Sequence, residues 1–173
     1  MSRSQRFKGI YSRQQLRKYF RSFLGQTLRE IWTVVFEYGG EVEDWTRADP
    51  EFVFDEGDFW CTVIFGDKLR AMPGRWEDTL VYINRETFDF IQECGKHWKV
   101  DRSAESRYSN LVGKSLESVI LIDNRFGDVA GVEFRFEDRV ATFYVMGDEA
   151  WFIPGEARTR LCELQYEFTD VIR

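Results

Sequence analysis

Hydrophobic and polar positions follow a similar order in two parts of the chain, Phe23–Gly74 and Leu111–Gly155. The matched positions are Gly25 with Gly113, Leu28 with Leu116, Gly39 with Gly127, Phe52 and Phe54 with Phe134 and Phe136, Gly66-Asp67 with Gly147-Asp148, and Pro73-Gly74 with Pro154-Gly155. The offset falls from 88 residues to 81, so the first copy carries about seven extra residues, most of them between Gly40 and Phe52. Glycines and an apolar pattern that survive a change of length indicate a duplicated structural unit.

Each copy predicts an antiparallel β-meander. Val132, Phe134 and Phe136 alternate with Glu133 and Arg135, which gives that strand one apolar and one polar face. Strands are expected at Leu28–Phe36, from Phe52 to Phe54, and at Phe59–Phe65, Leu116–Ile122, Gly131–Phe136, Val140–Met146 and Ala150–Ile153, with one more in each copy at Thr79–Ile83 and Arg160–Leu164. The C-terminal Leu164, Tyr166 and Phe168 favour a strand over a helix, followed by a short helical end. The paired strand phenylalanines are expected in the core.

Helices are expected at two places. Leu16, Tyr19, Phe20, Phe23 and Leu24 form one helical stripe, and Ser12 can cap a helix from Arg13 to about Phe23. Thr87–Cys94 has a second helical face. The fold class is therefore α+β, mainly antiparallel β, with two tandem copies of a β-meander unit, an N-terminal helix and one or two further short helices. We expect the first repeat in residues 1–95, a linker in 96–110 and the second repeat in 111–173, with one shared core.

The charge is unevenly distributed. The net charge is −6, but residues 1–29 hold eight Arg or Lys and no acid, which leaves 16 bases against 30 acids in the remainder. The chain after residue 29, called the body below, thus has a net charge of −14, which repels nucleic acid phosphates and attracts basic partners. The basic N-terminal segment either packs on this body or contacts an anionic partner, and we prefer the first because its apolar stripe needs a surface to cover. We expect neither nucleic acid nor a membrane as partner.

Residue types that carry catalysis are sparse. His97 is the single histidine, in the expected linker, and no Ser-His-Asp set, Cys-His set or phosphate-binding loop is recognisable. Asp55, Glu56 and Asp58 lack the length and spacing of a calcium loop. Three widely spaced cysteines without an apolar leader indicate reduced thiols. We therefore expect a cytoplasmic protein that is not an enzyme and has no cofactor or metal.

The most unusual local feature is the acidic stretch Glu41–Asp58, with eight acids in 18 residues. Its functional interpretation is a loop that presents carboxylates and an aromatic anchor to a basic protein partner, because acids steer the encounter and a buried Trp holds the complex. The alternative is a solvated insertion with Trp45 folded on the core. The expected contact residues are Glu41, Glu43, Asp44, Trp45, Asp49, Asp55, Glu56 and Asp58.

The stretch LVGKSLESVILIDNRFGDVAGVEFRF (111–136) resembles the small, acidic, β-rich bacterial immunity proteins that neutralise toxins of contact-dependent or secreted toxin systems. The resemblance implies a non-catalytic binder that occludes a toxin domain, often a nuclease. It supplies no functional residues. The alternative is a duplicated small-ligand-binding or regulatory module with a pocket between the repeats.

Overall fold

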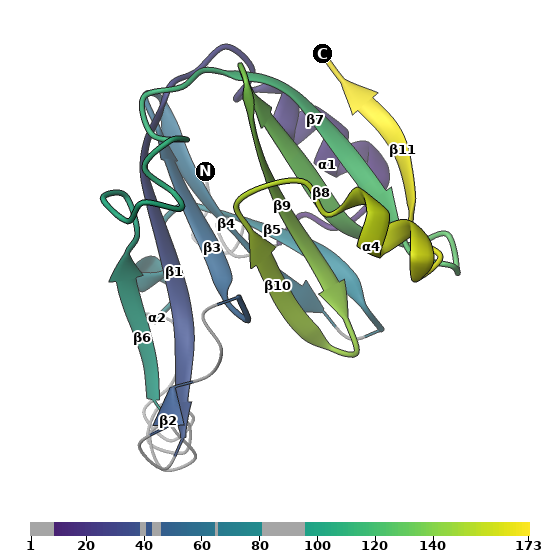
Figure 1. Ribbon diagram of the computed structural model, residues 1–173, viewed down its shortest axis with the longest axis horizontal. Coiled ribbons are helices and arrows are strands. Elements are labelled where there is room, and N and C mark those ends of the chain that lie inside the picture. Colours follow the sequence, from purple (N-terminus) through teal and green to yellow (C-terminus); the bar gives the residue numbers. More distant parts are fainter. Residues whose placement is uncertain (1–8, 39–40, 43–45, 65, 81–95) are drawn as a thin grey trace, which may run out of the picture.

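The chain folds as two antiparallel β-sheets that pack against each other, as the computed structural model in Figure 1 shows. It describes residues 9–38, 41–42, 46–64, 66–80 and 96–173. The prediction of a mainly antiparallel β protein with an N-terminal helix and a further short helix is confirmed. The expected helix at Thr87–Cys94 lies outside the described residues.

The first sheet is built from residues 28–101. Its strands are β1 (Leu28–Tyr38), β2 (Glu41–Val42), β3 (Asp49–Phe54), β4 (Gly57–Ile64), β5 (Lys68–Pro73) and β6 (Lys96–Asp101). The strands β1, β3, β4 and β5 form a meander, the short β2 pairs with the end of β1, and β6 returns to pair with β1. A single-turn helix, α2 (Glu77–Leu80), follows β5.

The second sheet has the same order of strands. Its members are β7 (Leu116–Asp123), β8 (Val129–Phe136), β9 (Arg139–Met146), β10 (Glu149–Ile153) and β11 (Glu167–Ile172), with the helix α4 (Arg158–Glu163) between β10 and β11. The first four strands form a meander, and β11 returns to pair with β7, the first strand of that meander. The two meanders and their returning strands follow the same order, whereas β2 of the first sheet has no counterpart in the second.

The starts of the two meanders contact each other through reciprocal backbone hydrogen bonds. The Gly25 amide donates to the Leu116 carbonyl and the Gly113 amide donates to the Leu28 carbonyl, both at 2.8 Å. Gly25 and Gly113 have φ of 79° and 84°, which glycine adopts without the steric cost of a Cβ atom. The same two glycines were matched in the sequence pattern.

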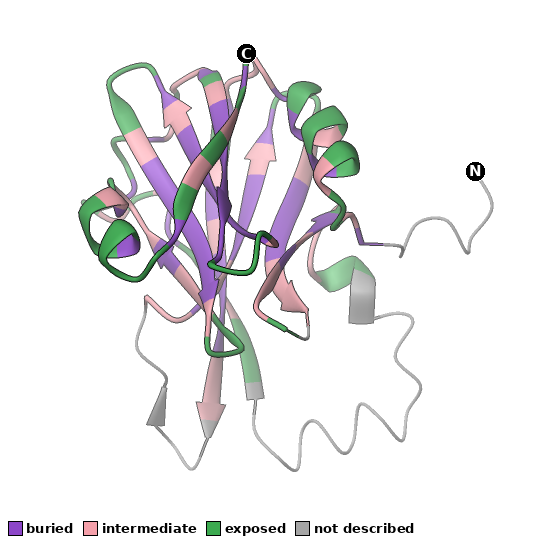
Figure 2. Cartoon of the chain, turned by 90° about the vertical axis from the view of Figure 1, so that its right-hand side faces the viewer, coloured by how far each residue is buried: buried purple, intermediate pink, exposed green. Residues whose placement is uncertain are grey.

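The core between the sheets consists of aromatic and aliphatic side chains, and the expected phenylalanines lie in it. Phe52 and Phe134 are fully buried with ring centroids 4.8 Å apart. Phe54 and Phe136 stack at 6.3 Å, with 3% and 0% of their surface exposed, so the predicted burial of all four rings is confirmed. Figure 2 shows the buried segments along the strands of both sheets.

The N-terminal helix α1 (Arg13–Arg21) packs on the body, as the internal interpretation of the basic segment predicts. Ser12 caps it by accepting a hydrogen bond from the Gln15 amide at 3.3 Å. Leu16 and Phe20 are fully buried, and the Phe20 ring lies 5.5 Å from both Phe59 and Phe134. Arg17 and Lys18, on the other side of the helix, are exposed.

Arg13 joins this helix to the second sheet. Its guanidinium forms ion pairs with Asp123 of β7 and Asp170 of β11, the latter at 2.9 Å. These contacts raise the pKa of Arg13, first through the hydrogen bond to Asp170 and then through the one to Asp123. Arg17 pairs with the same Asp170 at 3.3 Å, so two of the cations of this helix are paired within the fold.

Three expected strand assignments were wrong because turn and helix preferences outweighed a short apolar pattern. Arg160–Leu164 overlaps α4, in which Leu161 is buried and its neighbours face water. Thr79 and Leu80 belong to α2, so the expected strand Thr79–Ile83 does not begin there. The C-terminal strand begins at Glu167 rather than Leu164 and continues to Ile172 without the expected helical end.

The expected linker 96–110 contains a strand. Lys96–Asp101 is β6, which pairs with β1 from Trp32↔Asp101 to Glu37↔Lys96. The polar residues of this segment hid the strand in the sequence, because their contacts are ion pairs and ring contacts rather than apolar burial. The strand β5 was also missed, although its Leu69 and Ala71 are fully buried.

Candidate functional site

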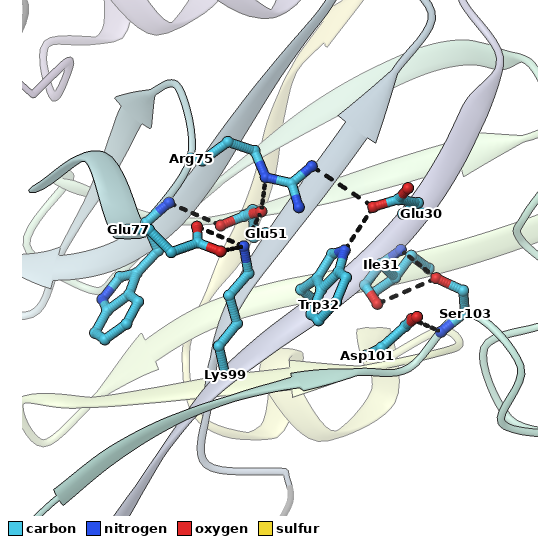
Figure 3. Close-up of polar contacts among 10 residues, drawn as sticks. Glu30, Ile31, Trp32, Glu51, Arg75, Glu77, Lys99, Asp101 and Ser103 are labelled. Carbon is cyan, nitrogen blue, oxygen red and sulfur yellow. Dashed lines mark hydrogen bonds and ion pairs between the residues drawn. The ribbon is translucent and has the colours of Figure 1, made fainter.

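The outer face of the first sheet holds a buried carboxylate, Glu51 of β3, whose side chain is 0% exposed. Arg75 Nε lies 2.6 Å and Lys99 Nζ 2.8 Å from its Oε1 atom, and the Trp76 amide donates to Oε2 at 2.8 Å (Figure 3). Arg75 follows the Pro73-Gly74 turn and Lys99 lies on β6. Glu51 therefore ties the segment after the meander and the returning strand to the middle of the sheet.

Trp32 and two further acids complete this ion-pair cluster. Trp32 lies directly across from Glu51 on β1, and the Lys99 ammonium lies 4.8 Å from the centre of its ring. Glu77 pairs with Lys99 at 2.5 Å, and Glu30 pairs with Arg75 at 3.6 Å. Because each cation has two carboxylate partners, the cluster is electrostatically satisfied, and we interpret it as structural.

The second sheet has a buried glutamate at the matched position. Glu133 of β8 precedes Phe134 as Glu51 precedes Phe52, and it is also 0% exposed. Arg135 Nη2 lies 2.8 Å and Arg158 Nη2 of α4 3.3 Å from Glu133 Oε1. In both sheets a buried carboxylate thus holds an arginine from the segment that follows the meander.

A cleft opens two residues before Glu51 on β3, where Asp49 lies across from Val34 of β1. Its volume is about 300 Å³. Both halves of the chain contribute to it, and its described lining is Val34, Phe36, Arg47, Ala48, Asp49, Val63, His97, Asp148, Glu149 and Ala150. The last three residues come from the turn between β9 and β10 and from the start of β10.

Asp49 is the half-buried acid of this cleft. The Thr62 hydroxyl donates to its Oδ2 atom at 2.8 Å, and the structure shows no ion pair for Asp49 within the described ranges. Burial raises the pKa of Asp49 to about 7, and the hydrogen bond from Thr62 opposes this rise. Asp49 and Glu51 lie two residues apart on one strand, yet only Glu51 has cations beside it.

The remaining charges of the cleft are arranged around its mouth. Arg47 pairs with Glu149 at 3.2 Å and lies 5.0 Å from the centre of the Trp151 ring, so its charge is already engaged. Asp148 is exposed, and its side chain has no ion pair in the part of the chain that the structure describes. The described lining of the cleft therefore has more carboxylates than cations.

One wall of the cleft is aromatic. The rings of His97 on β6 and Phe36 on β1 have centroids 5.0 Å apart, and these residues are paired in the sheet register. Burial lowers the pKa of His97, which favours its neutral form. The site combines this wall with the Asp49 carboxylate, an arrangement suited to an organic cation.

The structure separates the eight residues that the sequence proposed as a binding surface. Glu41 lies in β2, and Glu43, Asp44 and Trp45 lie outside the described residues. Asp49 begins β3, whereas Asp55, Glu56 and Asp58 lie at or beyond the other end of that strand. Of the predicted residues whose side chains are described, only Asp49 lines the cleft.

The acids at the β3–β4 turn have local contacts. Asp55 pairs with Arg29 and accepts a hydrogen bond from the Thr27 amide at 3.2 Å, and these contacts lower its pKa. Asp58 is half-buried, and desolvation raises its pKa. Glu56 is exposed, and its amide donates to the Gln26 side chain at 3.1 Å.

Sequence reasoning missed the contribution of Asp148, Glu149 and His97 to the cleft. In the sequence, Gly147-Asp148 stands out only as a matched position of the two copies, and His97 only as a residue of the expected linker. A usable signal existed in the matched pairs Gly66-Asp67 and Gly147-Asp148, because equivalent turns of two facing meanders can meet. They do meet, since the Asp148 amide donates to the Asp67 carboxylate at 2.6 Å.

Other classes of site receive no support from the described residues. They contain no group of three or more His, Cys, Asp or Glu side chains placed to hold a metal ion. They also include no helix of the length and apolarity that a membrane span requires. Comparisons with protein-family models, with curated proteins and with solved structures give no match.

Proposed function

We propose that this protein is a non-catalytic protein-binding module, an immunity or inhibitor protein of the bacterial cytoplasm that occludes a basic partner such as a toxin domain. The observation that carries the proposal is the cleft around Asp49, where acids outnumber the cations available to neutralise them. The strongly acidic body would steer a basic partner toward this cleft and raise the association rate.

The internal use of the chain's other charges supports this choice. Arg13, Arg75 and Lys99 are each held by two carboxylates of the fold. Asp49 and Asp148 have no such cation in the described chain, although both lie in the cleft. Carboxylates that the fold leaves without a cation are the groups best suited to receive one from a partner.

The test is neutralisation of a toxin whose gene neighbours the gene for this chain. Co-expression of the wild-type protein should restore growth, and the complex should weaken with salt, which screens charges over about 8 Å at physiological ionic strength. The double substitution Asp49→Asn and Asp148→Asn should reduce protection. A control variant, Asp138→Asn, changes an exposed acid at the other end of β9 and should protect fully. No protection by wild-type protein would contradict the proposal.

A small-ligand-binding or regulatory module is the second candidate, and one observation favours it. The cleft is lined by residues of both halves of the chain, as a pocket between repeats would be. A thermal-shift screen of small amines and metabolites tests it. A ligand that stabilises the wild type and not the Asp49→Asn variant would favour this function over protein binding.

We also propose that the two halves are tandem copies of one β-meander unit. The shared strand order, the reciprocal bonds of Gly25 and Gly113, and the matched buried glutamates Glu51 and Glu133 support it. A superposition of Phe23–Gly74 on Leu111–Gly155 should place Glu51 on Glu133. A best superposition that matched other residues would contradict the duplication.

A further inference from the structure

We infer that the cleft between β3 and the β9–β10 turn is a binding pocket for the guanidinium group of an arginine side chain, with Asp49 as its anionic contact. The inference rests on the proposed function, since it assigns the arginine to the basic protein partner. It adds the chemical group that the cleft recognises and the residues that recognise it.

The position of Asp49 on the sheet isolates its charge. Along one row of the first sheet, Lys99 lies across from Val34, and Val34 lies across from Asp49. The Lys99 ammonium is directed away from this row, toward Glu51 at 2.8 Å and Glu77 at 2.5 Å. The cation nearest along the sheet is therefore already paired, and among the described residues the Asp49 carboxylate has only the neutral Thr62 hydroxyl as a donor.

Apart from the Arg47–Glu149 ion pair, the rest of the lining matches a flat cation on an apolar stem. Phe36 and His97 supply aromatic surface, and Val34, Val63 and Ala150 supply aliphatic surface for methylene groups. Asp148 at the mouth offers a second carboxylate. A guanidinium stacks on rings and donates from a planar fork to more than one acceptor, whereas an ammonium is a compact and strongly hydrated charge. The mixed lining therefore favours arginine over lysine.

Titration of the full-length chain with Nα-acetyl-arginine-methylamide, followed by amide chemical shifts, tests the pocket. The citrulline analogue is the matched control ligand, because it has nearly the same shape without the charge. Saturable shifts are expected at Phe36, Val63 and Ala150 with the arginine compound only. Asp49→Asn should raise the Kd by at least about tenfold, as the loss of one charge-assisted contact predicts.

Variants and controls keep this test independent of folding. Asparagine at position 49 can still accept the hydrogen bond from Thr62, so Asp49→Asn preserves this contact of the fold. Asp148→Asn changes an exposed side chain and should weaken binding without unfolding the protein. Asp138→Asn, with a side chain that is 64% exposed, should leave the Kd unchanged. Equal binding of citrulline, or an unchanged Kd in Asp49→Asn, would overturn the inference.

Two outcomes separate the pocket from the proposed function. If a toxin partner bound wild-type and Asp49→Asn protein equally well, the pocket would be wrong and the inhibitor function would stand. If the arginine compound bound in the cleft but no toxin were neutralised, the protein partner would be wrong and the guanidinium pocket would stand. Much tighter binding of spermidine than of the arginine compound would overturn the assignment to a protein side chain.

Discussion

The substitution Glu51→Gln removes one charge from a fully buried position and nearly preserves the size of the side chain. Lys99, whose side chain is 8% exposed, would keep Glu77 as a partner, and Arg75 would keep the more distant Glu30 at 3.6 Å. Breaking a buried ion pair costs about 3–5 kcal/mol when the remaining charge has no other partner. Because both cations retain a carboxylate, we expect a loss of about 3 kcal/mol, near the lower limit of that range.

Glu133→Gln is the matched substitution in the second sheet, and its cost should be smaller. Glu133 is as buried as Glu51, but the side chains of Arg135 and Arg158 are 37% and 40% exposed. Water can solvate both guanidinium groups once the carboxylate is gone, so no buried charge is left unpaired. We expect a loss of about 1 kcal/mol, the usual contribution of one hydrogen-bonded contact.

Urea unfolding of the two variants measures this difference directly. If the slope of the unfolding free energy against urea concentration is unchanged, the variant exposes as much surface on unfolding as the wild type does. For a protein of this size, about 3 kcal/mol corresponds to a decrease in Tm of roughly 6–12 °C. Equal losses in the two variants, or a larger loss for Glu133→Gln, would refute the argument that the exposure of the partner cations sets the cost.

Three further predictions follow from the core, the helix and the cleft. Phe134→Ala should cost roughly 3–5 kcal/mol in chemical denaturation, because the ring is fully buried. Asp123→Asn should speed amide hydrogen exchange in α1, because it removes one of the acids that hold Arg13. Asp49 has a pKa of about 7 in the folded protein and about 4 when unfolded, so its stabilising contribution is complete below about pH 4 and lost as the pH rises through about 7. Urea unfolding of Asp49→Asn at two pH values should therefore show a smaller decrease of stability with pH than the wild type.

The sequence predicted the elements whose apolar pattern is long and regular. The β8 pattern of Val132, Phe134 and Phe136 and the helical stripe through Leu16 and Phe20 both lie in the core. These elements bury a complete face, so the side-chain period alone identifies them. Their exact ends moved by a few residues, as in β3, which begins at Asp49 rather than Phe52.

The errors fall where tertiary contacts replace an apolar face. The strand β6 is stabilised by pairing with β1 and by the ion pairs of Lys99, and neither contact leaves a periodic apolar signal. Likewise α4 has a single buried apolar residue, Leu161, which fits a short strand as well as a helix. The cleft could not be predicted because its lining comes from five separate segments of the chain.

The asymmetry between the two halves explains where the cleft lies. Lys68 of β5, in the first half, pairs at 3.0 Å with Asp128, which lies just before β8 in the second half. The residue matched to Lys68 is Glu149 of β10, and it pairs with Arg47, which lies just before β3 in the first half. The two ion pairs occupy corresponding places with their charges reversed.

The first copy carries its extra residues at this same place. Within this stretch Thr46 contacts the other sheet, because the Phe152 amide donates to the Thr46 carbonyl at 2.8 Å. If the chain is duplicated as proposed, this insertion turned one of two equivalent contacts between the sheets into a cleft and left Asp49 at its side. Shortening the insertion toward the length of the second copy should then remove guanidinium binding and preserve the Phe52–Phe134 core. Arginine binding that survived such a shortening would show that the pocket depends on the sheets alone.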